Sequence, residues 1–179
     1  MIHHQALTAA STILPLGQSS GKEDEMQYLT FFLGEEMFAM DIRIVREIIQ
    51  HGAMTVVPLM PEFVRGVINL RGAVVPVIDL QSRFGRGAAQ VGKKTCVIIF
   101  DADQEGDRME LGLMVSAVSE VIEIASSEIE PPPQFGTSIP REFIRGLGKV
   151  GSEFIVILEP DKALNVDDMV ALAELEQPN

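Results

Sequence analysis

The sequence predicts a mainly β protein built from small barrels. About ten short runs rich in β-branched and aromatic residues follow one another at close spacing, and turn-forming residues separate them. Helical segments are few, which argues against a parallel sheet, because parallel strands need long crossover connections.

The size and charge of the chain exclude several classes of protein. At 179 residues it suits one domain or two small fused ones, and 46% hydrophobic with 22% charged residues is typical of a globular protein. The net charge of −12 argues against nucleic-acid binding, which depends on Lys and Arg neutralising phosphates. No apolar run approaches the ~20 residues that a membrane helix needs. The single cysteine, Cys96, lies in an apolar run and indicates a reducing compartment.

Positive charge is concentrated in one segment. Residues 63–94 contain six basic residues and one acidic residue, whereas the rest of the chain is strongly acidic. Such asymmetry is typical of proteins that dock onto partners by charge complementarity. A basic loop on the outside of a sheet explains the pattern equally well.

The chain begins with a leader and a hairpin. Residues 1–26, with two histidines and an acidic run, predict a mobile leader. No basic residue precedes the apolar stretch 6–16, which argues against a signal peptide. Residues 28–33 and 37–40 then predict two strands around a turn.

A short helix is expected after the first hairpin. Asp41 caps it, and it spans residues 42–50. Its apolar residues cover an arc of about 160°, wider than the ~100° stripe that packing against one core requires. Part of that face is free for a partner, unless the helix sits in a crevice between two sheets.

The remaining elements are mostly strands. Residues 80–84 predict a helical turn, and 85–94 a Gly-rich basic loop. A C-terminal helix is expected after Asn165, with Asp167 and Asp168 at its positive end. The other predicted strands span residues 54–60, 95–100, 109–115, 118–124, 143–144 and 154–158.

The stretch 66–80 is expected to organise the fold. Two β-branched runs, 67–68 and 74–78, flank Arg71-Gly72, and glycine tolerates the positive φ of a tight turn, so the pattern predicts a β-hairpin. Both arms are apolar almost without alternation, so protein should cover both faces. Arg71 then lies at the turn, either as a contact residue or as an ordinary solvated side chain.

Three motifs that resemble catalytic or ligand sites lack the context they need. Gly146, Gly148 and Gly151 match G-x-G-x-x-G, but a strand follows instead of the helix that a dinucleotide site requires. The acidic run 101–107 resembles the start of an EF-hand loop, without the glutamate that ends such a loop. One histidine outside the leader, His51, and no G-x-S-x-G sequence argue against a nucleophilic triad. We therefore expect no catalysis, cofactor or metal.

Several segments carry a family resemblance when they are taken together and in order. They are Phe31-x-x-Gly34-x-x-x-Phe38-Ala39-x-Asp41, Ile44 to Ile48, Val64 to Gly72, Val75 to Leu80 and Gly146-Leu147-Gly148. This set, and the string G-V-x-N-L-R-G above all, resembles the CheW family of bacterial chemotaxis coupling proteins over residues 27–176.

The resemblance implies two five-stranded SH3-like barrels packed together over residues 27–179, between which the chain can cross. It also implies a non-catalytic adaptor that joins the cytoplasmic tips of methyl-accepting chemoreceptors to the regulatory domain of the histidine kinase CheA. Such an adaptor is cytoplasmic, is recruited to membrane receptor arrays and does not insert into the membrane.

The resemblance further implies which residues bind these partners. They fall on the expected helix, on the hairpin and on the strand that forms the opposite wall of a groove between the barrels. They are Val45, Glu47 and Ile48, then Gly66, Asn69, Arg71 and Gly72, then Cys96 and Val97.

Other functions stay open at this point. A coupling protein of a chemotaxis-like, non-motility pathway would have the same sequence features, and so would a detached kinase regulatory domain. A CheV-type adaptor would need a receiver domain, for which no residues remain. A small-molecule-binding β-barrel is the alternative from another class.

Overall fold

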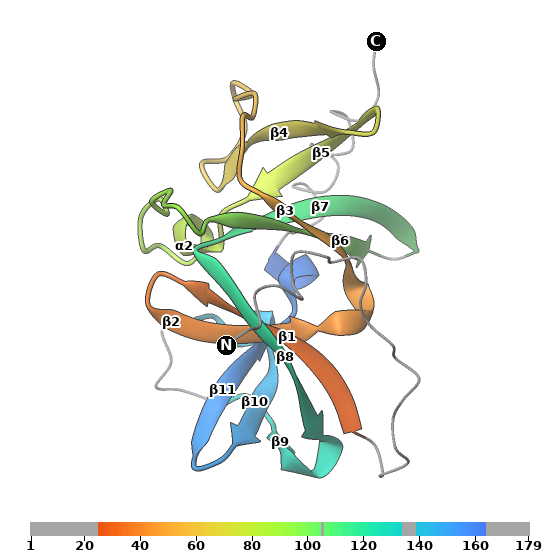
Figure 1. The fold of residues 1–179 in the computed structure, drawn as a ribbon, viewed down its shortest axis with the longest axis vertical. Helices are drawn as coiled ribbons and strands as arrows, with labels where there is room; N and C mark the ends of the chain where they lie inside the picture. The colour runs from red at the N-terminus through yellow and green to blue at the C-terminus, as the bar shows by residue number, and fades with distance from the viewer. Residues whose placement is uncertain (1–24, 105, 134–138, 164–179) are drawn as a thin grey trace.

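Two β-sheets packed on each other form this protein, whose computed structural model describes residues 25–104, 106–133 and 139–163 (Figure 1). One sheet has six strands and the other has five, which confirms the predicted mainly β fold with two β subdomains. The six-stranded sheet exceeds the expected five strands because a two-residue strand, β9, is added at its edge.

The six-stranded sheet contains the first two and the last four described strands. Its order is β8-β1-β2-β11-β10-β9, antiparallel except for the pair β2–β11. The strands are β1 (Glu25–Leu33), β2 (Glu36–Asp41), β8 (Ala117–Ala125), β9 (Ile129–Glu130), β10 (Ile144–Val150) and β11 (Glu153–Leu158).

The five-stranded sheet lies between β2 and β8 in the chain, so the chain leaves the first sheet and later returns to it. Its order is β3-β6-β7-β5-β4, and β5–β7 is its parallel pair. The strands are β3 (Val45–Gln50), β4 (Val64–Leu70), β5 (Ala73–Ile78), β6 (Cys96–Gln104) and β7 (Asp107–Val115).

Helical segments are short among the described residues. The predicted helical turn is confirmed as α2 (Leu80–Arg83), where the Asp79 side chain accepts hydrogen bonds from the backbone N–H groups of Gln81 and Ser82. The 3-10 segments are η2 (Ile42–Ile44), η3 (Ser126–Glu128), η4 (Arg141–Phe143) and η5 (Pro160–Ala163).

Alternate residues of the central strands face two different cores. On β6, Val97 and Ile99 pack with residues of the five-stranded sheet, whereas Ile98 and Phe100 belong to a buried cluster shared by both sheets. Phe31 of β1 lies in the same shared cluster. Both faces of such a strand are buried, which explains why these runs are apolar without alternation.

The helix predicted over 42–50 is wrong. Asp41 does cap a helical turn, but that turn ends at Ile44 and the chain continues as β3, antiparallel to β6. On β3, Ile48 packs against the cluster between the sheets, whereas Ile49 packs within the five-stranded sheet. The wide apolar arc therefore came from a strand with protein on both faces.

The strand predicted over 54–60 is also wrong. Within it, Thr55 forms an isolated bridge with Val67 of β4. β1 begins at Glu25, so the end of the expected leader is part of a strand. The rest of that leader and the helix expected after Asn165 lie outside the described residues.

Candidate protein-interaction site

The turn of the β4–β5 hairpin has a left-handed backbone at both central residues. Arg71 has a φ of 54° and Gly72 a φ of 89°, between the paired residues Leu70 and Ala73. This is the two-residue turn whose twist matches that of the strands it joins. The Asn69 side chain accepts a hydrogen bond from the Gly72 N–H at 3.0 Å. The predicted hairpin is confirmed, and the side chain of Asn69, a residue of the hairpin itself, stabilises the turn.

Arg71 reaches from this turn to Glu47 on β3. Its guanidinium donates hydrogen bonds to both carboxylate oxygens of Glu47, and this hydrogen bonding raises the pKa of Arg71. β3 and β4 are the two edges of the five-stranded sheet, so the ion pair spans those edges. The Arg71 side chain is still 68% exposed, so its orientation is restrained while it stays accessible to a partner.

Gly66 lets the segment after β3 close onto β4. Thr55 and Val67 exchange backbone hydrogen bonds of 2.9 and 2.8 Å. A Cβ atom at Gly66 would lie 2.6 Å from the carbonyl oxygen of Thr55, a distance that side chains do not adopt. Gly66 is buried, so within the site it supports the hairpin from inside.

The four apolar candidates lie in one sheet instead of on two facing walls. Val45 and Ile48 on β3 are half-buried against the cluster between the sheets. Cys96 and Val97 belong to β6, the strand that pairs with β3, and Val97 is only 1% exposed. The predicted groove with β3 and β6 as opposite walls is wrong, because these strands are hydrogen-bonded neighbours.

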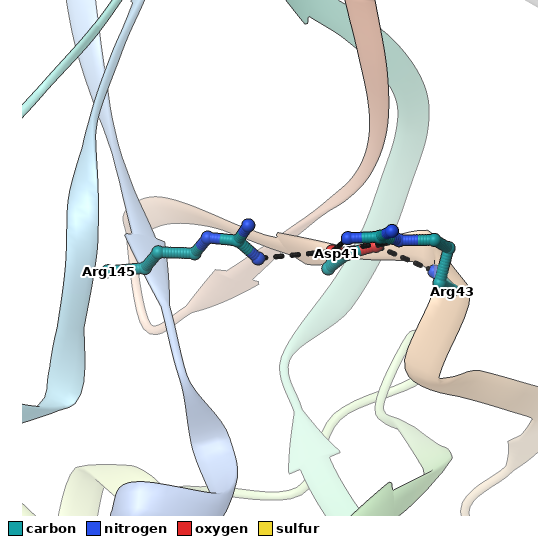
Figure 2. Close-up of polar contacts among 3 residues, drawn as sticks. All are labelled: Asp41, Arg43 and Arg145. Carbon is teal, nitrogen blue, oxygen red and sulfur yellow. Dashed lines mark hydrogen bonds and ion pairs between the residues drawn. The ribbon is translucent and has the colours of Figure 1, made fainter. Parts of the chain in front are cut away.

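Asp41, at the end of β2, binds one arginine in the segment that links the two sheets and one arginine on β10 (Figure 2). Arg43 and Arg145 approach Asp41 from opposite sides, with their closest nitrogens at 2.7 and 3.0 Å from Oδ2. Burial by itself would raise the pKa of Asp41, but the hydrogen bonds from both arginines outweigh it and the pKa is lowered. Because Arg43 lies in η2, this cluster fixes the point where the chain crosses from one sheet to the other.

A second carboxylate anchors the basic loop. Asp79 is fully buried, and its Oδ2 accepts hydrogen bonds from the Ala89 N–H at 2.8 Å and from Arg65 at 2.9 Å. Arg65 also donates to the Ala89 carbonyl oxygen at 3.0 Å. These hydrogen bonds therefore hold the middle of loop 85–94 against β4 and the start of α2.

The described residues contain no group of three or more His, Cys, Asp or Glu side chains placed to hold a metal ion. Burial raises the pKa of the Cys96 thiol, which favours the unreactive protonated form. In the described part of the chain, no helix is long and apolar enough to cross a membrane.

The structure brings together some candidates and adds others that sequence reasoning missed. Glu47 and Arg71 were both predicted, but their pairing was not. Asp79 in front of a helical turn is a local capping signal, which accounts for half of its hydrogen bonds. Arg145 lies 104 residues from Asp41, so no local pattern announces that contact.

Comparison with known proteins adds relatives that cover nearly the whole described chain. A family model described as a CheW-like domain matches residues 27–168. The chemotaxis protein CheW of Klebsiella aerogenes is 32% identical over 153 residues, covering 86% of this chain and 87% of the relative. Protein FrzA of Myxococcus xanthus is 27% identical over 150 residues, covering 83% and 91%. The crystal structure of the scaffolding protein TtCheW from Thermoanaerobacter tengcongensis has a TM-score of 0.71 at 38% identity, covering 80% of this chain and 94% of that one.

Proposed function

Because this chain belongs to the CheW family, we propose that it is a non-catalytic adaptor in chemotaxis signal transduction. It couples the cytoplasmic tips of chemoreceptors to the regulatory domain of the histidine kinase CheA. The observation that carries this proposal is the family match over residues 27–168, which includes strands of both sheets. In this proposal the protein works in the cytoplasm and is recruited to receptor arrays.

The geometry of the hairpin supports this role. Asn69 stabilises the turn, and Glu47 orients the guanidinium of Arg71, which stays exposed. An arginine held in this way suits a protein interface, where arginine is enriched and little side-chain entropy is left to lose. In this proposal Arg71 contacts a partner directly, Asn69 and Gly72 shape the turn, and Val45 and Ile48 contribute the apolar part at the sheet boundary.

The two sheets also allow two partners to bind at once. Each sheet contributes one face to the shared cluster. The parts of the two sheets that lie away from this cluster are at opposite ends of the molecule (Figure 1). An adaptor needs such separated surfaces, because it must hold a receptor and a kinase in one complex. A small-molecule-binding barrel is not favoured, since the relatives named above are chemotaxis and scaffolding proteins.

Titration of the purified chain against two probes tests the proposal. The probes are a soluble receptor cytoplasmic tip and an isolated kinase regulatory domain, added separately and then together. We expect the chain to bind each one, and to form a ternary complex in which the two do not compete. Binding of neither probe, or strict competition between them, would refute the adaptor role.

A further inference from the structure

The short helix α2 belongs to the five-stranded sheet by its position in the chain, but it also contacts the six-stranded sheet. It follows β5 after one residue, Asp79, which caps it. In Figure 1 it lies at the level where the two sheets meet. A Cβ atom at Gly34, in the β1–β2 turn, would lie 3.3 Å from Nε2 of Gln81 on α2. One side of α2 therefore packs beside a turn of the other sheet.

Arg83, the last residue of α2, contacts two aromatic rings. Its guanidinium carbon is 5.3 Å from the ring centroid of Phe63 and 5.2 Å from that of Phe143. Phe63 comes directly before β4 of the five-stranded sheet, and Phe143 directly before β10 of the six-stranded sheet. Both distances lie within the ~6 Å at which a cation is attracted to the face of a ring. One guanidinium thus joins an aromatic residue from each side of the boundary.

Phe84 and Arg86 extend this contact towards the six-stranded sheet. The ring of Phe84 stacks on that of Phe143, with centroids 5.6 Å apart and 27° between the ring planes. The guanidinium carbon of Arg86 is 5.9 Å from the Phe84 centroid, and its Nη1 donates a hydrogen bond to Oε1 of Glu36 on β2 at 2.7 Å. Residues 83–86 are therefore tied to the six-stranded sheet at Phe143 and at Glu36.

The other end of this arrangement is fixed to the five-stranded sheet. The Asp79 N–H donates to the Phe63 carbonyl oxygen at 2.7 Å, and the Asp79 carboxylate binds Arg65 of β4 at 2.9 Å. The same carboxylate caps α2. Phe63 and Arg83 are thus held on one body, so a rotation of one sheet on the other would have to change the contacts of Phe143.

The shared buried cluster holds the two sheets together, but apolar packing has little directional preference. Cation–π and ring-stacking contacts do depend on the relative orientation of the groups. We propose that Phe63, Arg83, Phe84 and Phe143, here called the aromatic joint, fix the angle between the two sheets. Arg83 is then a positioning residue, which sets how the two partners of the adaptor lie relative to each other without touching either one. This role in the complex rests on the function proposed above.

Distances between two spin labels, one on each sheet, test the joint without any partner. Gln50 on β3 and Lys149 on β10 are exposed strand residues, so both are replaced by cysteine and labelled after Cys96→Ala has removed the native thiol. In Arg83→Gln we expect a distance distribution about twofold wider than in the parent protein, because small rotations of one packed sheet on the other are no longer restricted. The circular dichroism spectrum should not change. A residue that only stabilised α2 would lower the melting temperature and leave the distribution as it was.

Arg46→Gln is the matched control. Arg46 binds Asp101 at 2.8 Å, and both residues belong to the five-stranded sheet, so this variant loses an arginine contact within one sheet. Its distribution should keep the parent width. Phe143→Leu removes the ring on the other side of the boundary and should widen the distribution as Arg83→Gln does. The double variant should be no wider than either single one, because both lose the same contact.

In a second experiment, the receptor tip and the kinase regulatory domain carry the labels and the adaptor carries none. Arg83→Gln should bind each probe as tightly as the unmodified chain does, because the joint includes none of the proposed contact residues. In the ternary complex, the distances between the two probes should be about twofold more widely distributed. Weaker binding of one probe alone would show a direct contact, and an unchanged width would show that the joint does not position the partners. Either result overturns the positioning role.

Three outcomes of the first experiment overturn the joint itself. They are an unchanged width in both Arg83→Gln and Phe143→Leu, an equally wide distribution in the Arg46→Gln control, and a double variant wider than both single ones. This experiment needs no partner. Failure of the unmodified chain to bind the two probes would therefore overturn the proposed function, and the label distances would still decide the joint.

Discussion

Arg71 and Glu47 are 24 residues apart in the chain and form an ion pair with two hydrogen bonds between a hairpin turn and an edge strand. Glu47 lies on β3 and Arg71 directly follows β4, and these are the two edge strands of the five-stranded sheet. Arg71 adopts a left-handed conformation at a turn position that asparagine or glycine usually occupies. The conformational cost and the exposed guanidinium both support the proposal that Arg71 contacts a partner.

Arg71→Ala is expected to leave the melting temperature nearly unchanged and to abolish the receptor–kinase complex. The ion pair is largely exposed, and exposed pairs contribute little to stability. Circular dichroism and titration against each partner measure the two effects. Glu47→Gln separates orientation from contact: if Glu47 orients Arg71, this variant also weakens binding, but less. A stable and fully competent Arg71→Ala variant would show that the turn is not a contact.

Gly66→Ala is expected to lower the free energy of unfolding by about 1–3 kcal/mol, the usual cost of overpacking. The new methyl group would lie 2.6 Å from the Thr55 carbonyl oxygen and would push the closing segment away from β4. Urea denaturation measures the change. Gly52→Ala is the control, because a Cβ there meets nothing within 4 Å and should cost little. Equal stability of the two variants would contradict the close approach.

Asp41→Asn is expected to lower the free energy of unfolding by about 2 kcal/mol at pH 7, because hydrogen bonds to a charged group are lost. The arginines lower the pKa of Asp41 in the folded state, so its stabilising effect is complete above the ordinary aspartate pKa of 3.8. That effect is lost as the pH falls through the lower folded value. The gap between variant and unmodified protein should therefore narrow at acid pH.

Urea midpoints between pH 7 and acid pH measure that gap. Glu36→Gln is the control, because Glu36 forms an exposed ion pair with Arg86 and should contribute little. A gap that does not depend on pH would mean that the charge of Asp41 is not what stabilises the crossover.

The two sheets are expected to unfold together, because one buried cluster contains residues of both. Leu113→Ala, on β7 within that cluster, should lower the free energy of unfolding by about 2–5 kcal/mol. The chain has no tryptophan and one tyrosine, Tyr28, which packs in the six-stranded sheet. In the Leu113→Ala variant, the unfolding midpoint measured by Tyr28 fluorescence should therefore shift as much as the midpoint measured by circular dichroism. If the midpoint measured by Tyr28 fluorescence does not change in this variant, the two sheets unfold independently.

Local chemistry is what made the hairpin predictable. The turn lies between β-branched runs, and the tolerance of Gly72 for a positive φ is a property of that residue alone. The same holds for the cap that Asp79 provides to α2. The segment 42–50 misled the prediction because an apolar run does not say how many faces are buried. β3 has protein on both faces, and this depends on a second sheet that the local pattern cannot reveal.

The sequence by itself determined the mainly β class, the position of the central hairpin and a family resemblance carried by ordered motifs. Tertiary structure alone decided that Arg71 meets Glu47 and that Arg145 meets Asp41 across 104 residues. It also decided that residues 45–50 pair with β6 as a strand. The physical reason is that turns and caps depend on interactions a few residues apart, whereas strand pairing and ion pairs depend on segments that only the folded chain brings together.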